Sequence, residues 1–443
     1  MSPRSPSQTF TVVPRADRGK GSTEQWLVPG AVALSIALSM SYGVISLGPF
    51  WPDVYKSAVG SDFGHYDNIA RNLLDGKGFT LAGQPNIHRA PGFPIWIAGV
   101  YALTGRSYTA LVAVQILLVG FIVYLTSILA RQLGGERAGV LAAYVAAVNP
   151  VLIYYSIRPY SEPLFTVLSL LMVITVGPAL CRAIWWRVTV AGILAGMACL
   201  VRGQMLIIPV FLGLWWLWRL KWRGFSAALA FTLAMWFPIS PWTIRNYIVS
   251  GHFIPVQIQS GHVLWVSNND RVLSDPVYWG YNVDPSNTHV KPAGPGSPVE
   301  DQVRADQEKR EEALHFLREN VEKIPLLVTY KFTRFFSLGT RVELWKKTVL
   351  YALDLSLVPV AIGGIVVLSR RGVPALGASL AALLTTLVTV AVFWGDSRFR
   401  LTIEPYLIAL SAICVLAIWD LVQRVAKRGD GQASRVILEH RPG

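Results

Sequence analysis

The segment Tyr108–Ala130 reads YTALVAVQILLVGFIVYLTSILA and contains no charged residue. A helix that crosses a bilayer needs about 20 mainly apolar residues, and this segment meets that length. Its backbone polar groups could pair internally only as a helix in such surroundings. The segment therefore predicts a transmembrane helix, and comparable segments recur along the chain.

The composition of the whole chain is that of a membrane protein. Of its 443 residues, 53% are hydrophobic and only 15% are charged, whereas soluble proteins average about 25% charged residues. The net charge is +14, and basic residues that flank apolar segments orient them and contact anionic lipids. We therefore expect membrane lipids, and no nucleic acid, as the partners of this charge.

Ten segments are candidate membrane spans, which predicts a polytopic α-helical membrane protein. They are 27–48, 108–130, 138–153, 161–180, 188–201, 204–218, 225–244, 348–369, 374–394 and 404–422. If the N-terminus is cytoplasmic, each short inner loop carries at least two basic residues, as the positive-inside rule requires. These residues are Arg131 and Arg137, Arg182 and Arg187, Arg219, Lys221 and Arg223, and Arg370 and Arg371. An even number of spans places both termini in the cytoplasm.

The spans and charges divide the chain into five parts. They are a disordered cytoplasmic N-terminus (1–25), an N-terminal transmembrane module (26–244), an outer-face or periplasmic segment (245–347), a C-terminal transmembrane module (348–422) and a basic cytoplasmic tail (423–443). The first span is expected to be retained, because no small-residue cleavage site follows it. A long outer loop (49–107) and the mainly helical 245–347 segment place the functional surface on the outer face of the inner (plasma) membrane.

The first outer loop contains an unusually charged stretch, SDFGHYDNIARNLLDGKGF (61–79). Its apolar residues recur with helical spacing, at Tyr66, Ile69, Ala70, Leu73 and Leu74. This pattern predicts an amphipathic interfacial helix from about Phe63 to Asp75, ended by Gly76 and Gly78. Asp62 precedes it, and the residues alone leave two interpretations open: a helix cap or a functional carboxylate.

Acidic and basic residues gather at the outer ends of the spans. Glu162 begins a span, where a carboxylate is costly unless it is functional, paired, or stabilised by the helix dipole. The outer arginines are not explained by the positive-inside rule, although Arg89 alone could be a snorkelling residue. They are Arg89, Arg158, Arg202, Arg245, Arg398 and Arg400. Several arginines on one face favour an anionic ligand, most simply a phosphate or pyrophosphate.

The sequence predicts no cofactor with certainty. His65, His88, His252 and His262 lie in the outer segments, but their spacing matches no metal motif. We therefore predict no metal site, while the residues leave a divalent metal open as an alternative.

An ordered set of motifs resembles one family. Along the chain these are A-x-N-L-L-x-G-x-G-F (70–79), R-x-P-G-F-P (89–94), Y-S-E-P-L-F (160–165), G-x-x-x-G-x-x-x-L-x-R (192–202), P-W-T-I-R-N-Y (241–247), S-N-N (267–269) and R-F-R-L (398–401). Their order and topology resemble bacterial membrane glycosyltransferases of the GT-C superfamily, related to protein O-mannosyltransferases and lipid A aminoarabinose transferase. The likeness covers about residues 60 to 420.

The resemblance implies an inverting transferase in the cell envelope that uses a polyprenyl-phosphate sugar donor and a glycan, lipid or protein acceptor. It implies that Asp62 is the catalytic carboxylate, which acts as general base toward the acceptor hydroxyl or at least orients it. Relatives often carry a second acid beside it, where this chain has Phe63. Glu162 resembles the second outer-loop acid of the family. Arg89, Arg202 and Arg245 would hold the donor phosphate, with Arg158, Arg398 and Arg400 as further candidates.

Two other functions share some of these features. A lipid-linked sugar transporter or flippase would place charged or broken helices at the middle of the membrane. An O-antigen ligase or polymerase would share the outer arginines and the lipid-linked substrate.

Overall fold

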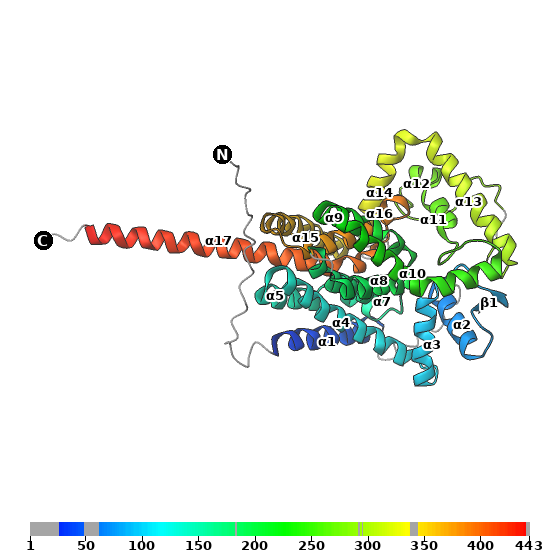
Figure 1. The fold of residues 1–443 in the computed structure, drawn as a ribbon, viewed down its shortest axis with the longest axis horizontal. Coiled ribbons are helices and arrows are strands. Elements are labelled where there is room, and N and C mark those ends of the chain that lie inside the picture. Colours follow the sequence, from blue (N-terminus) through cyan, green and yellow to red (C-terminus); the bar gives the residue numbers. More distant parts are fainter. Residues whose placement is uncertain are drawn as a thin grey trace.

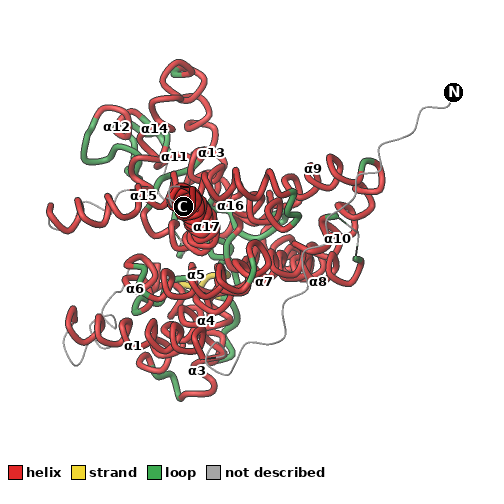
Figure 2. The backbone as a smooth tube through the Cα atoms, turned by 90° about the vertical axis from the view of Figure 1, so that its left-hand side faces the viewer, coloured by secondary structure: helices red, strands yellow, loops and turns green. Residues whose placement is uncertain are grey.

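Helices form almost all of the regular structure of this chain. The computed structural model describes residues 26–47, 62–181, 184–290, 293–294, 296–336 and 344–439. The predicted disordered segment 1–25 lies outside these ranges. Most of the described helices run side by side in one bundle, and Figure 2 shows the last of them end on within it.

The bundle matches the predicted spans closely. Its elements are α1 (Leu27–Leu47), α4 (Tyr108–Gly134), α5 (Glu136–Ala147), α6 (Pro150–Ser156), α7 (Glu162–Val176), η3 (Gly177–Leu180), α8 (Trp185–Val201), η4 (Gly203–Ile207), α9 (Ile208–Leu220), α10 (Trp222–Ser250), α15 (Leu344–Arg371), α16 (Ala375–Val392) and α17 (Glu404–Glu439). Each predicted span coincides with one helix or with two consecutive helices. Within the described residues seven helices are long and apolar enough to span a membrane, or eight if α5 and α6 form one span. The chain is therefore a multi-pass α-helical membrane protein, as predicted.

The span predicted at 138–153 is bent, because α5 and α6 meet at an angle of 54°. The Asn149 side chain accepts hydrogen bonds from the backbone N–H groups of Val151 and Leu152, at 3.0 and 3.1 Å. Pro150 follows at the first helical position and lacks an N–H that could continue α5. A side-chain cap and a proline thus start a new helix in the middle of the predicted span.

The close approach of α8 and α10 depends on two glycines of the G-x-x-x-G motif. A Cβ atom at Gly192 would lie 2.6 Å from the carbonyl oxygen of Phe231, and one at Gly196 would lie 2.2 Å from that of Met235. Small residues at this spacing let two membrane helices pack backbone to backbone. The contact fixes the end of α8, where Arg202 follows.

The remaining elements gather at one end of the bundle, which we call the loop end (Figure 1, right). They are α2 (Asp62–Leu74), the antiparallel strands β1 (Thr80–Leu81) and β2 (Gln84–Pro85), α3 (Gly92–Thr104), α11 (Ser260–Ser267), α12 (Asp270–Ser274), α13 (Val299–Glu319), η5 (Val321–Lys323), α14 (Ile324–Phe336) and η6 (Ser397–Thr402). The helix predicted at 63–75 is confirmed as α2. At the opposite end α17 extends beyond the bundle.

Candidate functional site

Five of the predicted site residues meet at the loop end, although five different segments carry them. Asp62 begins α2, Glu162 begins α7, Arg202 follows α8, and Arg398 lies in η6 between α16 and α17. Arg89 comes from the loop before α3. We call these five residues the acid–arginine cluster.

Asp62 lies between two arginines. Its Oδ1 is 2.8 Å from Nη2 of Arg89, and its Oδ2 is 2.8 Å from Nη1 of Arg398. The Asp62 side chain keeps 33% of its surface exposed. Burial raises the pKa of Asp62, but Arg398 and Arg89 outweigh this effect and hold the pKa well below its usual range. Asp62 is therefore an ionised carboxylate that solvent or a ligand can reach.

Glu162 is paired in the same cluster, but it is buried, with 3% of its side chain exposed. Its Oε1 lies 2.6 Å from Nη1 of Arg202 and 3.5 Å from Nε of Arg398. Arg398 thus joins the two predicted catalytic acids, and its Nε is also 3.4 Å from Oδ2 of Asp396. Removing one partner from a buried ion pair leaves an uncompensated charge, so Glu162 and Arg398 stabilise each other's placement.

Aromatic rings hold the arginines of the cluster in place. The guanidinium groups of Arg202 and Arg398 lie over the Phe399 ring, at 4.7 and 5.2 Å from its centroid. Arg89 lies 5.2 Å from the Tyr66 ring centroid. A planar guanidinium that rests on a ring keeps its in-plane N–H groups available for oxygen ligands.

The loop that carries Arg398 is fixed by close backbone packing. A Cβ atom at Gly395 would lie 1.8 Å from the carbonyl oxygen of Lys331 in α14. The fully buried Lys331 side chain donates hydrogen bonds to Oδ1 of Asn268 at 2.7 Å and to the carbonyl oxygens at the end of α16. Asn268 of the S-N-N motif therefore helps to fix the loop that carries Arg398, through its hydrogen bond with Lys331.

Three predicted phosphate-binding arginines have other partners. Arg245 donates to the carbonyl oxygens of Asn86 and Phe79, at 2.7 and 3.2 Å, and so holds the two ends of the β1–β2 hairpin together. Arg400 is fully buried and forms an ion pair with Glu404. Arg158 donates a hydrogen bond to the backbone carbonyl oxygen of Tyr154, and its guanidinium group lies over the Tyr154 ring. These contacts give each of the three a structural role within the chain.

Sequence reasoning did not assign three neighbours of the cluster to this site, although it considered His65 as a possible metal ligand. Asp396 accepts a hydrogen bond from the backbone N–H of Arg398 and so begins η6. The Nδ1 atom of His65 lies 2.9 Å from Nη2 of Arg89. Phe399 supplies the ring described above. The aspartate two residues before Arg398 was a visible capping signal, whereas the roles of His65 and Phe399 depend on tertiary contacts.

A cavity of about 240 Å³ adjoins the cluster on the side of Arg89. It lies between the loop before α3, α11, α13 and the short segment 293–294. Its lining residues are His65, His88, Arg89, Gln259, His262, Ala293, Gly294, Gln302, Ala305, Asp306 and Lys309. Because Arg89 and His65 belong both to this cavity and to the surroundings of Asp62, the two sites are contiguous.

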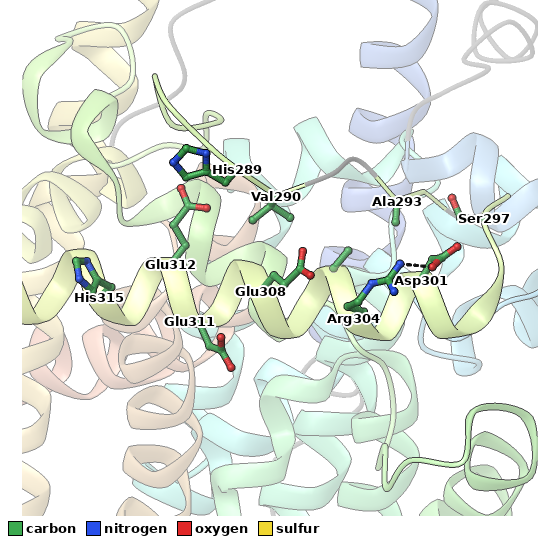
Figure 3. A pocket seen from close by; sticks show the side chains of 11 residues that line it. His289, Val290, Ala293, Ser297, Asp301, Arg304, Glu308, Glu311, Glu312 and His315 are labelled. Atoms are coloured by element: carbon green, nitrogen blue, oxygen red, sulfur yellow. Dashed lines mark hydrogen bonds and ion pairs between the residues drawn. The ribbon is translucent and has the colours of Figure 1, made fainter.

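A wider groove of about 970 Å³ runs along α13, on the other side of Ala293 and Ala305. Figure 3 shows Glu308 and Glu312 of α13 beneath the side chains of Val290 and His289, with the ion pair between Asp301 and Arg304 at one end. Four of the five charged residues that line the groove are thus acidic, namely Asp301, Glu308, Glu311 and Glu312, and the fifth is Arg304. The groove differs in charge from the smaller cavity that it adjoins.

The histidines of the smaller cavity make folding sensitive to pH. Burial, together with the nearby cations Arg89 and Lys309, lowers the pKa of both His88 and His262 to about 4. His65, Asp306 and Asp284 are the other charged or titratable groups that face them. The unfolded chain takes up protons near pH 6.5. We therefore expect stability to fall as the pH drops from about 6.5 toward 4, and to level off below.

Thermal unfolding of the purified protein in detergent across this pH window measures the effect. Replacing His88 and His262 together with glutamine should flatten the pH dependence. The same change at the exposed His315 of α13 is the matched control and should leave it as in the wild type. Equal curves for wild type and double variant would contradict the prediction.

Metal binding finds no obvious place in the described part of the chain. No group of three or more His, Cys, Asp or Glu side chains there is arranged to hold a metal ion. The negative charge of Asp62 is balanced by Arg89 and Arg398.

Comparison with known proteins supports the fold. No family model matches the sequence, and no curated protein matches it. The solved structure of the oligosaccharyltransferase AglB from Archaeoglobus fulgidus, in complex with an inhibitory peptide and a dolichol-phosphate, is similar with a TM-score of 0.54 and 12% identity. The match covers 92% of this chain and 52% of AglB, so the chain spans about half the length of that protein.

Two further solved structures match. AglB in complex with zinc and sulfate gives a TM-score of 0.54 and 14% identity, over 89% of this chain and 49% of AglB. ArnT from Cupriavidus metallidurans, bound to undecaprenyl phosphate, gives a TM-score of 0.41 and 14% identity, over 87% of this chain and 78% of ArnT. That score is too low to support an argument. The AglB matches confirm the GT-C-like fold predicted from the motifs.

Proposed function

We propose that this protein is an inverting glycosyltransferase with its active site at the acid–arginine cluster, on the outer face of the membrane. It moves a sugar from a polyprenyl-phosphate donor to an acceptor hydroxyl. The observation that supports this most directly is Asp62, an accessible carboxylate between Arg89 and Arg398, where a membrane bundle ends. The AglB structure carries a dolichol-phosphate, which agrees with a lipid-linked donor.

The donor phosphate would lie beside Arg202 and Arg398. A polyprenyl chain stays among the lipids, so its phosphate must approach at the ends of the spans. Arg202 follows α8, and Arg398 lies between α16 and α17. Their stacking on Phe399 presents N–H groups to phosphate oxygens, which accept in bidentate fashion. The same cations stabilise the charge that develops on the leaving phosphate.

Transfer breaks the bond between the anomeric carbon and the phosphate oxygen, and that oxygen keeps the electron pair. The acceptor oxygen attacks from the opposite face and loses its proton to Asp62. In the structure Arg89 and Arg398 make Asp62 a weak base, because they stabilise its charged form. When the donor phosphate competes for Arg398, this stabilisation falls and the basicity of Asp62 rises. Donor binding would thus make Asp62 a stronger base before transfer.

Glu162 acts in this scheme as a positioning residue. It is buried and holds Arg202 and Arg398 at 2.6 and 3.5 Å, so it fixes the two arginines that face the phosphate. It does not need to touch the substrate itself.

The function is tested by mass spectrometry of envelope glycans and glycolipids from a strain that lacks the gene, beside its parent. We expect one glycan or glycolipid in the deletion strain to lack a single sugar, and the wild-type gene to restore it. Identical glycan and glycolipid profiles would contradict the proposal. The assay also identifies the sugar and the acceptor.

A transporter of lipid-linked sugars is the second candidate, because the break between α5 and α6 is a feature that such proteins use. A transporter moves its substrate across the membrane without forming a glycosidic bond. Purified protein in detergent, mixed with donor and acceptor, distinguishes the two candidate functions. Detergent micelles have no two membrane sides, so only a transferase forms product there.

Arg202→Gln is expected to raise the KM for the lipid-linked donor by about tenfold or more, because a charge-assisted contact to phosphate is lost. Arg187→Gln is the matched control, since Arg187 lies near the opposite end of the same helix, over Trp186. Its KM should equal that of the wild type. A donor KM that does not change in Arg202→Gln would remove Arg202 from the phosphate site.

A further inference from the structure

The cavity beside Arg89 offers mainly cationic and neutral polar groups. Arg89 and Lys309 are its two cations, and Asp306 is the carboxylate of its lining. Both oxygens of Asp306 already accept hydrogen bonds, from the backbone N–H groups of Gly261 at 3.1 Å and His262 at 2.9 Å. Arg310 adds an ion pair at 3.3 Å. The charge of Asp306 is thus balanced by its own neighbours, and Arg89 pairs with Asp62. Lys309, whose Nζ lies 3.3 Å from Nδ1 of His262, is then the cation of the lining that forms no ion pair among the described residues.

Two buried nitrogen atoms of the lining have no hydrogen-bond partner within the described residues. They are Nε2 of His88 and Nε of Arg89. Buried polar atoms are almost always hydrogen-bonded in folded proteins. Nε of arginine can only donate, and Nε2 of a neutral histidine can carry the proton. A ligand with acceptor oxygens would satisfy both atoms.

The position of the cavity separates it from the lipid phosphate. Arg202 and Arg398 follow the helices α8 and α16 of the bundle, whereas the cavity is enclosed by α11 and α13, which lie outside the bundle. Arg89 stands between them, since it contacts Asp62 and also lines the cavity. A group in the cavity therefore meets Asp62 on the side of Arg89, which contacts Oδ1, whereas Arg398 contacts Oδ2.

The volume limits the size of that group. Pockets for drug-sized ligands measure about 300–1,000 Å³, and this cavity measures about 240 Å³. It suits one polar ring with its substituents better than a longer chain. The side-chain amides of Gln259 and Gln302 line it as well and can pair with hydroxyl groups.

Given the function proposed above, we propose that this cavity is the acceptor subsite, and that it binds one negatively charged sugar ring of the uronic acid class. The ring carboxylate pairs with Lys309 and with the free Nε of Arg89, and the His88 ring donates to a ring oxygen or hydroxyl. The hydroxyl that accepts the transferred sugar then faces Asp62.

Saturation-transfer NMR on the full-length protein in nanodiscs tests the subsite with sodium D-glucuronate and D-glucose as probes, and line broadening of the ³¹P signal reports the binding of inorganic phosphate, which has no carbon-bound proton. We expect a signal from glucuronate that is about tenfold weaker in Lys309→Gln, because one charge-assisted contact is lost. D-glucose should give a much weaker signal than glucuronate. Arg318→Gln, an exposed change on the same helix, is the matched control and should bind like the wild type.

Each result decides the assignment. Equal signals from glucose and glucuronate would overturn the preference for an anion, and phosphate binding without glucuronate binding would overturn the sugar ring. No signal from either sugar would overturn the subsite altogether. If Lys309→Gln unfolds, Lys309→Arg keeps the charge and should retain binding. Binding needs no turnover, so a failure here is separate from a failure of the transferase function, which the glycan profile reports.

Discussion

Asp62→Asn is expected to lower the rate of sugar transfer by about 100- to 10,000-fold, the usual contribution of a positioned general base. Asparagine has nearly the shape of aspartate but cannot take a proton. It also leaves Arg89 and Arg398 without the carboxylate that each contacts at 2.8 Å. The chain should still insert and fold, because Asp62 lies at the start of α2 with a third of its side chain exposed.

The measurement is the rate of product formation by purified protein, with folding followed by thermal unfolding. Asp75→Asn is the matched control, because Asp75 follows the same helix and pairs with Arg106 and Lys77 on the surface. It should transfer sugar at the wild-type rate. Wild-type transfer by Asp62→Asn would remove Asp62 from the catalytic role.

Arg398→Gln is expected to lower the transfer rate by about 100-fold or more and to destabilise the fold by about 1–3 kcal/mol, since the buried Glu162 loses one of its two cations. Asp62, Glu162 and Asp396 would lose their shared cation. Because that cation helps hold the pKa of Asp62 down, the substitution should also move the pH profile of any residual activity upward.

Transfer rates as a function of pH and thermal unfolding together test this expectation. Arg398→Lys keeps the charge but loses the planar fork, so it should restore stability more than activity. Arg271→Gln in α12 is a control for the loss of one arginine at the loop end, and it should resemble the wild type. An active and stable Arg398→Gln protein would show that the network is dispensable.

The fold was largely predictable because each membrane helix carries its own signal. Length and hydropathy locate a span such as α4 without any tertiary knowledge. The break at Asn149 and Pro150 was missed because the residues on both sides are apolar. Only the cap and the missing N–H reveal it. Hydropathy averaged over a window does not detect a helix cap or a missing N–H, so it predicted a single span.

The site was only partly predictable, since pairing across the chain leaves no local trace. Asp62 and Glu162 stood out as acids at the edge of the membrane, and the structure brings them together through Arg398. Arg400 has the same local context as Arg398, yet the turn of η6 directs it inward to Glu404. Two arginines with one residue between them therefore have different partners, which spacing alone cannot show.

The cluster also has a consequence for biogenesis. Its carboxylates come from Asp62 and Glu162, early in the chain, while the cation that joins them is Arg398. During synthesis both carboxylates leave the ribosome long before the segment with Arg398 does. Until then the nascent chain holds two acids without their shared counter-ion. Under the proposed function, the protein would therefore stay inactive until the segment with Arg398 is in place.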